Sequence, residues 1–423
     1  MEFKSPLDDE VNYQQLRQAQ VIKLRSSLRV GQTKLVDWSG GSLAISAVPG
    51  AGKSHSLAVA AALTIAKYQL HARKQLIIVT YTRSAAASIK NKIRDRLKQL
   101  YLPPGGFRVQ TLHGLALNIA NSHPELSGLN LDESTLVIPT PSHRVIRATV
   151  EQWIANHPQL YQVLLAGAEE FDGEETERLR RQSVLRTEIL PQLAHTAIRE
   201  SKSSGLLPKD LAQIASYSRD AYQILQVASG LYQEYQAVMQ SRGLIDYDDM
   251  ILAALQVLEE PPVLRRWQSQ VFGVFEDEAQ DSSPLQEKLI TLLAKDPDNY
   301  HLSPNLIRVG DPNQAINSTF TPADPVYFNW FCQVCQTEGK LGTMKQAGRS
   351  SKVIIEAANL VLQWVNQLWH SEEKDLDNCS ASPFRWQKIE PVDSNDPQPE
   401  ANPTPVGKGL EIYYPPDIHH TVK

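Results

Sequence analysis

Short apolar runs alternate with helical segments along much of the chain. The first run covers residues 43–47 and leads into an alanine-rich segment from Leu57 to about Lys67 that has helical character. Further runs that are largely apolar cover residues 76–81, 271–275 and 306–309, the last of which includes Arg308. Continuous apolar runs of this length are typical of strands buried on both faces, and helices between such strands connect them in parallel. The pattern therefore predicts an α/β fold built on a parallel sheet.

The middle of the chain has a different pattern. Strand signals fade over residues 115–242, where leucine and alanine recur with helical spacing, so we predict an all-helical insertion there. The sheet domain is then expected to comprise residues 1–114 and 243–335, and residues 336–423 to form a partial second domain. The proline-rich, acidic stretch of about 390–408 is expected to be a disordered linker.

Length, charge and cysteine content narrow the class of protein. A chain of 423 residues is long enough for two or three domains. The formal net charge of −5 excludes a bulk polycation, so any nucleic-acid surface would have to be local. No apolar run is long enough to span a membrane, and the three cysteines suit a reducing compartment. We therefore expect a cytoplasmic protein with no membrane partner.

The apolar run at 43–47 leads into a glycine-rich turn. Gly50 and Gly52 would let backbone N–H groups point inward at a phosphate, and the following helix would add its positive end. Lys53 would reach the β- and γ-phosphates, and the Ser54 hydroxyl would bind magnesium. Ala47 stands where this pattern normally has glycine, and a turn without a ligand is the alternative. The predicted nucleotide-binding residues are Pro49, Gly50, Ala51, Gly52, Lys53, Ser54 and His55.

Two carboxylates follow another apolar run. The strand expected at 271–275 leads directly into Asp277 and Glu278. Opposite a phosphate loop, Asp277 would hold magnesium through water, and Glu278 would polarise the water that attacks the γ-phosphate. Acidic residues that merely end a strand are the alternative. The phosphate loop and this pair supply complementary halves of one site, which favours the catalytic interpretation.

Three further residues are candidates for the same site. Gln314 follows the apolar run at 306–309 and is placed to sense the γ-phosphate. Arg349 would stabilise charge on the γ-phosphate, as an arginine finger does. The amide of Gln32 would recognise an adenine edge, because an amide both donates and accepts hydrogen bonds. A solvated helix residue is the alternative for Gln32.

A basic segment and one histidine are candidates for contact with nucleic acid. The helix expected after residues 76–81 starts at the carboxyl end of a strand, beside the nucleotide loop, which favours contact with a phosphate backbone. A solvated charged face is the alternative. His113 has the same two interpretations, as a backbone contact or as an ordinary loop histidine. The basic residues of the helix are Lys90, Lys92, Arg94, Arg96 and Lys98.

The order of these blocks resembles the UvrD/Rep family of superfamily 1 DNA helicases. The resemblance extends over roughly residues 28–365, and the family also has a helical insertion between its motifs Ib and II. The matching stretches are the Gln32 region for the Q motif, 47–54 for motif I, 79–93 for Ia, 109–116 for Ib, 275–286 for II, 309–316 for III and 345–350 for IV.

The resemblance implies a function for these stretches. It implies two RecA-like domains that bind ATP and Mg²⁺, and ATP-driven movement along single-stranded DNA, usually with 3′-to-5′ polarity. By the same resemblance, Tyr81, Arg83, His113 and Phe320 are the expected DNA contacts. The ring of Phe320 would offer a face for base stacking.

The chain departs from the family pattern at several positions. Gly348 stands where the family has an aromatic residue that stacks on adenine, and Asn317 stands where motif III continues with an aromatic residue. Nothing after Arg349 resembles motifs V and VI. The second RecA-like domain is therefore expected to be incomplete, with a separate polypeptide as the partner that supplies the rest. An ATP-dependent DNA-binding switch, or a helicase fragment that does not unwind DNA alone, is the alternative function.

Overall fold

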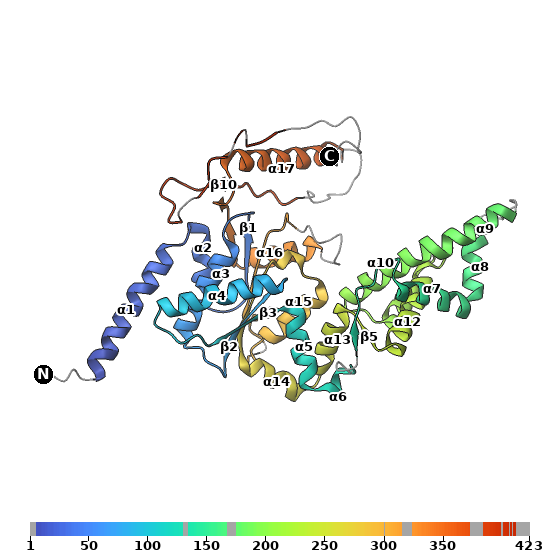
Figure 1. The fold of residues 1–423 in the computed structure, drawn as a ribbon, viewed down its shortest axis with the longest axis horizontal. Coiled ribbons are helices and arrows are strands. Elements are labelled where there is room, and N and C mark those ends of the chain that lie inside the picture. The colour runs from blue at the N-terminus through green and yellow to red at the C-terminus, as the bar shows by residue number, and fades with distance from the viewer. Residues whose placement is uncertain are drawn as a thin grey trace.

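A six-stranded parallel sheet lies at the centre of the molecule (Figure 1). The strand order is β3-β2-β6-β7-β1-β8, and the predicted parallel α/β fold is confirmed. The strands are β1 (Leu43–Ala47), β2 (Gln75–Thr80), β3 (Phe107–Thr111), β6 (Val271–Asp277), β7 (Leu306–Gly310) and β8 (Leu341–Met344). This computed structural model describes residues 6–129, 134–166, 175–299, 301–314, 324–372, 384–398, 401–405, 407 and 409–411.

Helices cover both faces of the sheet. Leu76 and Ile78 of β2 pack in one hydrophobic cluster, and Ile77 and Val79 of the same strand pack in another. Because both faces are buried, a strand is apolar along its whole length, which explains the continuous runs in the sequence. The first cluster includes α2 (Val30–Val36), α3 (Lys53–Tyr68) and α4 (Arg83–Gln99), and the second includes α5 (Leu112–Ser122), α13 (Tyr247–Val257), α15 (Pro284–Ala294) and α16 (Pro325–Thr337).

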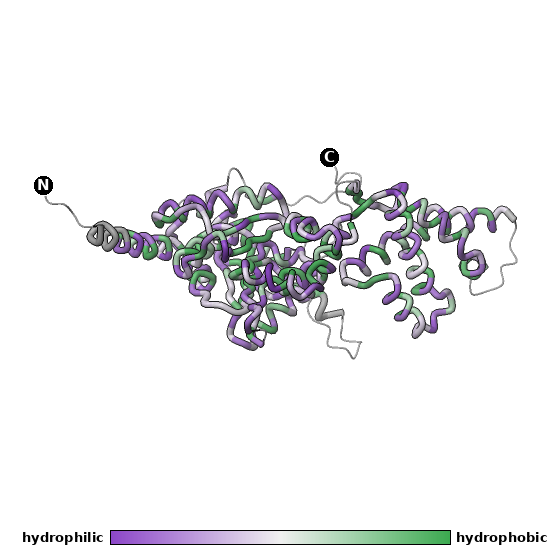
Figure 2. Tube along the Cα trace, turned by 90° about the horizontal axis from the view of Figure 1, so that it is seen from below, coloured by the Kyte–Doolittle hydropathy of each residue, from purple (hydrophilic) through white to green (hydrophobic). Residues whose placement is uncertain are grey.

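The helical insertion forms a separate lobe with its own core. Trp153, Tyr232 and Tyr235 are among the largest side chains buried there. Figures 1 and 2, which are turned by 90° relative to each other, both show this lobe beside the sheet domain. Its helices are α7 (Arg144–Asn156), α8 (Pro158–Ala166), α9 (Glu175–Val184), a π-helical turn (Leu185–Ile189), α10 (Leu190–Ser203), α11 (Pro208–Ala215) and α12 (Ile224–Ser241).

The insertion begins later than residue 115. Leu115 and Ile119 of α5 pack in the same cluster as Ile251 of α13, so α5 is part of the sheet domain. The short helix α6 (Pro124–Ser127) follows α5 and contacts α13 as well. The chain then enters the insertion through β4 (Thr135–Leu136) and leaves it through β5 (Leu244–Ile245), and these two strands pair in parallel.

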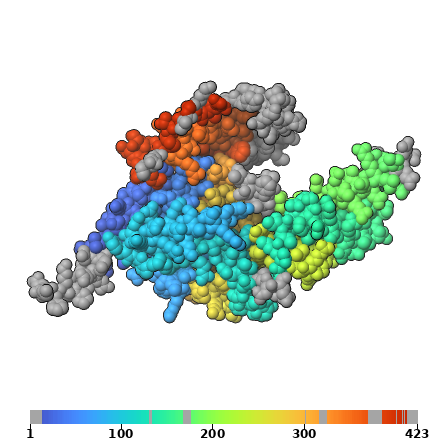
Figure 3. Space-filling model, in the orientation of Figure 1, coloured from blue at the N-terminus to red at the C-terminus, as the bar shows by residue number. Residues whose placement is uncertain are grey.

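The sheet domain also extends beyond residue 335, because β8 pairs with β1. After β8, the short strand β9 (Gln346–Ala347) pairs with β10 (Glu390–Pro391), and α17 (Lys352–Glu372) lies between them in the sequence. Figure 3 shows this C-terminal part resting against the N-terminal part of the sheet domain.

Residues 384–398 and 401–405 are called the C-terminal strap below. They form hydrogen bonds and an ion pair with the sheet domain and with residues 346–350, so the prediction of a disordered linker over about 390–408 is wrong for these residues. Proline restricts the backbone without requiring disorder, and the same composition suits an extended segment that packs on a surface.

Two helices lie at the margins of the sheet domain. α1 (Pro6–Ser26) projects from it at the N-terminal end, and α14 (Pro261–Gln270) precedes β6 (Figure 1). Within the described ranges, no helix has both the length and the apolar composition that crossing a membrane requires.

Candidate functional site

The loop between β1 and α3 has the backbone geometry of a phosphate cradle. Gly50 and Gly52 have φ angles of 76° and 84°, in the left-handed region that favours glycine. A Cβ atom at Gly52 would lie 2.7 Å from the amide nitrogen of Gln32, so a side chain there would displace the Gln32 amide and would also be strained by the positive φ angle. α3 begins at Lys53, directly after this turn, and its N-terminus carries the positive end of the helix dipole.

Two contacts join this loop to the end of β6. The Lys53 Nζ atom lies 2.8 Å from Glu278 Oε2. The Ser54 hydroxyl donates to Asp277 Oδ2 at 3.2 Å. Only β7 separates β1 from β6 in the sheet, so the carboxyl ends of these strands lie at the same edge. The fold thus brings together the residues predicted to hydrolyse a nucleotide.

Buried carboxylate oxygens make this edge suitable for a cation. Asp277 Oδ1 and Asp311 Oδ2 are buried, and neither has a hydrogen-bond partner among the described residues. Burial raises the pKa of each carboxyl group to about 6. The charge of Glu278 raises the pKa of Asp277 further, whereas Lys53 and Ser54 oppose the shift.

A divalent cation would offset this burial of negative charge, and Mg²⁺ prefers hard oxygen donors. The Ser54 hydroxyl and the Asp277 carboxylate therefore fit a magnesium ion, which would supply positive charge to phosphate oxygens.

Glu278 is held by neighbours on two sides. Its φ angle is 58°, a left-handed conformation that is uncommon for a residue with a Cβ atom and that is associated with functional sites. Gln280 donates from Nε2 to Glu278 Oε2 at 2.9 Å. The Oε1 atom of Gln280 accepts a hydrogen bond from the backbone N–H of Asp311 at 2.9 Å. Gln280 thus connects Glu278 to the loop after β7, a role that was not predicted from the sequence.

The other two predicted catalytic residues lie in adjacent loops. Gln314 is in the turn after β7, where its backbone N–H donates to the Asp311 carbonyl at 3.0 Å. The loop of Arg349 touches the phosphate loop, because the Gly348 N–H donates to the Gly50 carbonyl at 3.2 Å. Arg349 therefore lies beside the phosphate loop. The role predicted for Gln314, to sense the γ-phosphate, stays a prediction.

Gln32 is 1% exposed, so the alternative of a solvated helix residue is wrong. Its Oε1 accepts a hydrogen bond from the backbone N–H of Arg29 at 3.0 Å, and its Nε2 donates to the Ala51 carbonyl at 2.7 Å. The amide ties the start of α2 to the phosphate loop. In this conformation its donor and acceptor are engaged by the protein rather than turned toward an adenine edge.

A cavity of about 850 Å³ opens on the same side of the phosphate loop as Gln32. Its walls come from α1, α3, α4 and the C-terminal strap, and include Leu24, Ser27, His55, Pro397 and Gln398. Burial lowers the pKa of His55, and the charges of Arg96, Lys92 and Arg29 lower it further. The neutral imidazole that results both donates and accepts hydrogen bonds, which suits the sugar or base of a nucleotide.

Three of the four predicted DNA contacts share another cavity. Tyr81, Arg83 and His113 line a space of about 460 Å³ whose opposite wall comes from α10 and α12 of the insertion. The His113 ring lies 4.7 Å from the Tyr247 ring. Burial lowers the pKa of His113 to about 4, so the imidazole is neutral near pH 7 and does not attract phosphate by charge. Phe320 lies outside the described residues.

A buried ion cluster on this cavity connects the two lobes. Lys202 of α10 lies 2.7 Å from Asp246 Oδ2 and 2.5 Å from Asp249 Oδ1. Tyr235 of α12 donates to Asp246 Oδ2 at 2.8 Å. Burial alone would lower the pKa of Lys202, but the two carboxylates outweigh it and raise the pKa. The cluster was not predicted, because the partners are 44 and 47 residues apart in the sequence.

The chain is similar to known DNA helicases. The ATP-dependent DNA helicase SRS2 of Saccharomyces cerevisiae is 26% identical over 339 residues, which are 79% of this chain and 26% of that protein. DNA helicase II of Escherichia coli is 28% identical over 247 residues, or 57% of this chain and 27% of that protein. The ATP-dependent DNA helicase PcrA of Leuconostoc citreum is 24% identical over 345 residues, or 81% of this chain and 40% of that protein.

The chain therefore spans between about a quarter and two fifths of the length of these relatives. The model of the UvrD/REP helicase N-terminal domain matches residues 28–333. This stretch is more than half of the chain, and it contains the phosphate loop, the carboxylate pair and the helical insertion. The predicted resemblance to UvrD/Rep helicases is confirmed, and the chain belongs to the family of the UvrD/REP helicase N-terminal domain.

Proposed function

We propose that this chain is the ATP-binding part of a DNA helicase or translocase, which couples Mg²⁺-dependent ATP hydrolysis to 3′-to-5′ movement along single-stranded DNA. The proposal rests on two contacts, the ion pair between Lys53 and Glu278 and the hydrogen bond between Ser54 and Asp277. The names of the relatives describe ATP-dependent DNA helicases, and family membership supports the same activity here. The small number of cysteines agrees with a cytoplasmic location.

The pairing of Lys53 with Glu278 gives a route from nucleotide binding to hydrolysis. When Lys53 binds the β- and γ-phosphates, its ammonium group leaves Glu278 and frees that carboxylate to act as a base. Glu278 then accepts a proton from water as the water oxygen attacks the γ-phosphorus. The bond from the γ-phosphorus to the bridging oxygen breaks, which releases ADP and phosphate, and Arg349 stabilises the transferred group.

The DNA strand is proposed to pass over the cavity between the two lobes. Tyr81 and Tyr247 are exposed there and offer rings to unpaired bases, and Arg83 supplies positive charge for phosphates. Tyr81 directly follows β2, which is the neighbour of β6 in the sheet. The proposed DNA contacts and the γ-phosphate site are therefore carried by the ends of neighbouring strands.

A second candidate function is an ATP-dependent DNA-binding switch that does not unwind DNA alone. One observation favours it, an exposed apolar face on α17. A contiguous apolar surface of this kind marks a contact site, and an ATP-driven motor of two lobes steps by closing them on each other. Under this candidate, a separate polypeptide would supply the rest of a second RecA-like domain. The exposed residues are Ile354, Leu360, Val361, Trp364 and Leu368.

The test is ATP hydrolysis by the purified chain, with and without single-stranded DNA, beside the variant Lys53→Ala. DNA-stimulated turnover that the substitution abolishes supports the motor ATPase. ATP binding without stimulated turnover supports the switch instead. If the wild-type chain does not bind ATP, both candidates are wrong.

A further inference from the structure

The C-terminal strap is bonded to the end of β1 and to the loop after β7. The amide of Gln387 forms two hydrogen bonds with Ser46, at 2.5 and 3.2 Å. The side chain of Asn313 bonds to the backbone N–H and carbonyl of Arg385, at 2.9 and 2.8 Å. Both Ser46 and Asn313 belong to segments that lead into the nucleotide site.

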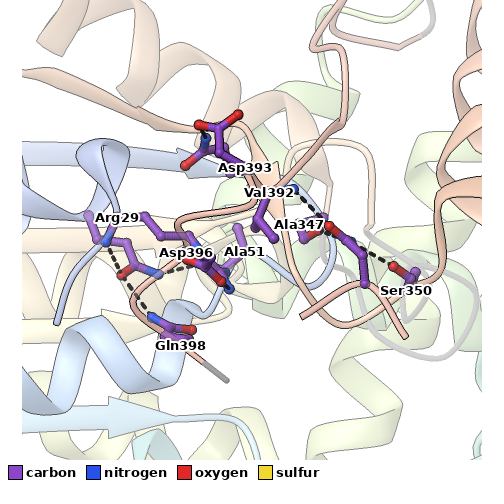
Figure 4. A network of polar contacts seen from close by, with 11 residues as sticks. Arg29, Ala51, Ala347, Ser350, Val392, Asp393, Asp396 and Gln398 are labelled. Carbon is purple, nitrogen blue, oxygen red and sulfur yellow. Dashed lines mark hydrogen bonds and ion pairs between the residues drawn. The ribbon is translucent and has the colours of Figure 1, made fainter. Parts of the chain in front are cut away.

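The strap also holds the loop that carries Arg349 (Figure 4). The Asn402 side chain donates to the carbonyls of Ala347 and Ser350, at 2.7 and 2.8 Å. Its backbone N–H donates to the Gly348 carbonyl at 2.7 Å. Three hydrogen bonds from one residue therefore fix the loop on both sides of Arg349, within the segment that touches the phosphate loop.

The third attachment is a buried ion pair. Arg29 donates from Nε and Nη2 to the two carboxylate oxygens of Asp396, at 3.0 and 2.8 Å (Figure 4). The two side chains are only 5% and 6% exposed. The guanidinium group lies against Gly348, where an added Cβ atom would meet Arg29 Nη2 and would lie 3.0 Å from Cζ. Arg29 thus takes up the space into which a side chain at position 348 would project.

The contacts of Asp396 with Arg29 and of Gln398 with Gln32 lie on one side of the phosphate loop. The carboxylates Asp277 and Asp311, which suit the γ-phosphate and its cation, lie on the β6 and β7 side. The cavity of about 850 Å³ lies on the other side, where His55 and the strap residues Pro397 and Gln398 form part of its wall, and Gln398 contacts Gln32. A nucleotide with its phosphates on Lys53 must direct its sugar and base toward that second side. A volume of this size accommodates a nucleoside.

We propose that the C-terminal strap forms the wall of the nucleotide site that faces the base, and that Asp396 is a positioning residue for ATP. Asp396 accepts hydrogen bonds from the Arg29 guanidinium group. The backbone N–H of Arg29 donates to the Gln32 amide, which in turn donates to the Ala51 carbonyl of the phosphate loop. The proposal deepens the proposed ATPase function and rests on it. The ligand class is a nucleoside triphosphate, of which the strap senses the nucleoside part.

The chemistry of the wall suits a base. Gln398 donates from Nε2 to Gln32 Oε1 at 3.4 Å, a long contact that a ligand group would displace at little cost. The Gln398 amide freed by that exchange both donates and accepts hydrogen bonds, as the edge of a nucleobase requires. The planar cation of Arg29 is neutralised by Asp396. The rest of the cavity lining is basic, with Lys23, Lys92, Arg96 and Lys98 beside the single carboxylate of Asp95.

The test compares two ligands, Mg·ATP and inorganic tripolyphosphate with Mg²⁺, by titration calorimetry without DNA. Tripolyphosphate carries the phosphates and lacks the nucleoside. We expect Asp396→Asn to weaken ATP binding about tenfold, the order of effect of losing one charged hydrogen-bonded partner, and to leave tripolyphosphate binding unchanged. Asp396→Glu should restore most of the affinity. Asp393→Asn makes the same change at an exposed carboxylate of the same strap and should bind both ligands as the wild type does.

A second variant covers the case in which Asp396→Asn does not fold. Gln398→Ala removes a wall residue without touching the ion pair, and it should likewise weaken ATP binding alone. Equal weakening of both ligands by these variants would overturn the proposal, because it would mean that the strap only stabilises the phosphate loop. Unchanged ATP affinity would overturn it as well. If the wild type binds both ligands but shows no DNA-stimulated hydrolysis, the motor function fails while the strap proposal stands.

Discussion

Glu278 combines a left-handed backbone with two polar contacts, one to Lys53 and one to Gln280. A carboxylate held in this way keeps its oxygen near the phosphate loop before any nucleotide binds. The removal of its charge should therefore affect the chemical step more than binding.

We expect Glu278→Gln to lower the rate of ATP hydrolysis by about 10²–10⁴-fold, the usual contribution of a general base. ATP affinity should be retained or increased, because Lys53 no longer has a competing partner. Single-turnover hydrolysis and nucleotide titration measure the two quantities. A loss of affinity with unchanged turnover would mean that Glu278 binds rather than catalyses.

The buried carboxyl group of Asp311 should make stability depend on pH. Burial raises its folded-state pKa to about 6, above the value near 3.9 of an unfolded chain. Its contribution to stability is therefore fully present below the unfolded pKa and is lost as the pH rises through about 6. Asp311→Asn, which keeps an acceptor for the Asn313 N–H, should raise the free energy of unfolding at pH 7.5 by about 1–3 kcal/mol.

Urea unfolding of the metal-free protein at pH 7.5 and 4.5 measures this effect. The advantage of the variant should shrink at the lower pH. Asp298→Asn, at an exposed loop carboxylate, serves as the control. A variant that is less stable than the wild type at pH 7.5 would contradict the argument.

Residues whose partners are near in sequence or belong to a known pattern could be predicted. The phosphate loop and the pair Asp277–Glu278 are of this kind. Gln280 and Asp396 could not be predicted, because the sequence does not say which distant groups they meet. Asp396 lies 367 residues from Arg29, and only the folded chain brings them together.

At the scale of elements, the strands that could be predicted from the sequence are those whose two faces are both buried. The runs that predicted β1, β2, β6 and β7 are apolar because helices cover both faces of those strands. β8 is an edge strand of mixed composition, and half of its side chains are not fully buried, so it gave no such signal. The strap was wrongly predicted to be a disordered linker, because proline and acidic residues occur in extended segments that pack on a surface as well as in disordered ones.

The contact of α10 with α13 depends on one lysine. Lys202→Met would leave Asp246 and Asp249 buried without their cation, and the removal of one partner of a buried ion pair costs about 3–5 kcal/mol. We expect a loss of stability of that order in urea unfolding. Lys209→Met, at an exposed lysine of the same lobe, should change stability little. An equal, small effect of both substitutions would show that the cluster does not hold the lobes together.

At the scale of the whole molecule, the sheet domain and the insertion share the cavity of Tyr81, Arg83 and His113. If single-stranded DNA crosses this cavity, a ring at its mouth should stack on a base. We expect Tyr81→Ala to weaken binding of a thymidine oligonucleotide by about 1–3 kcal/mol. Fluorescence anisotropy at fixed salt measures the affinity. Tyr217→Ala removes an exposed ring elsewhere on the insertion and should have no effect.

The pairing of β4 with β5 has a consequence for how the helical insertion can change in length and content over evolution. The chain leaves the sheet domain and returns to it on adjacent strands, with the Thr135 N–H donating to the Gly243 carbonyl at 2.8 Å. The distance between the two ends of the insertion is therefore independent of what lies between them. The helices that lie away from the sheet domain, α8 and α9, can therefore lengthen, shorten or be exchanged over evolution while the phosphate loop and its carboxylates keep their geometry.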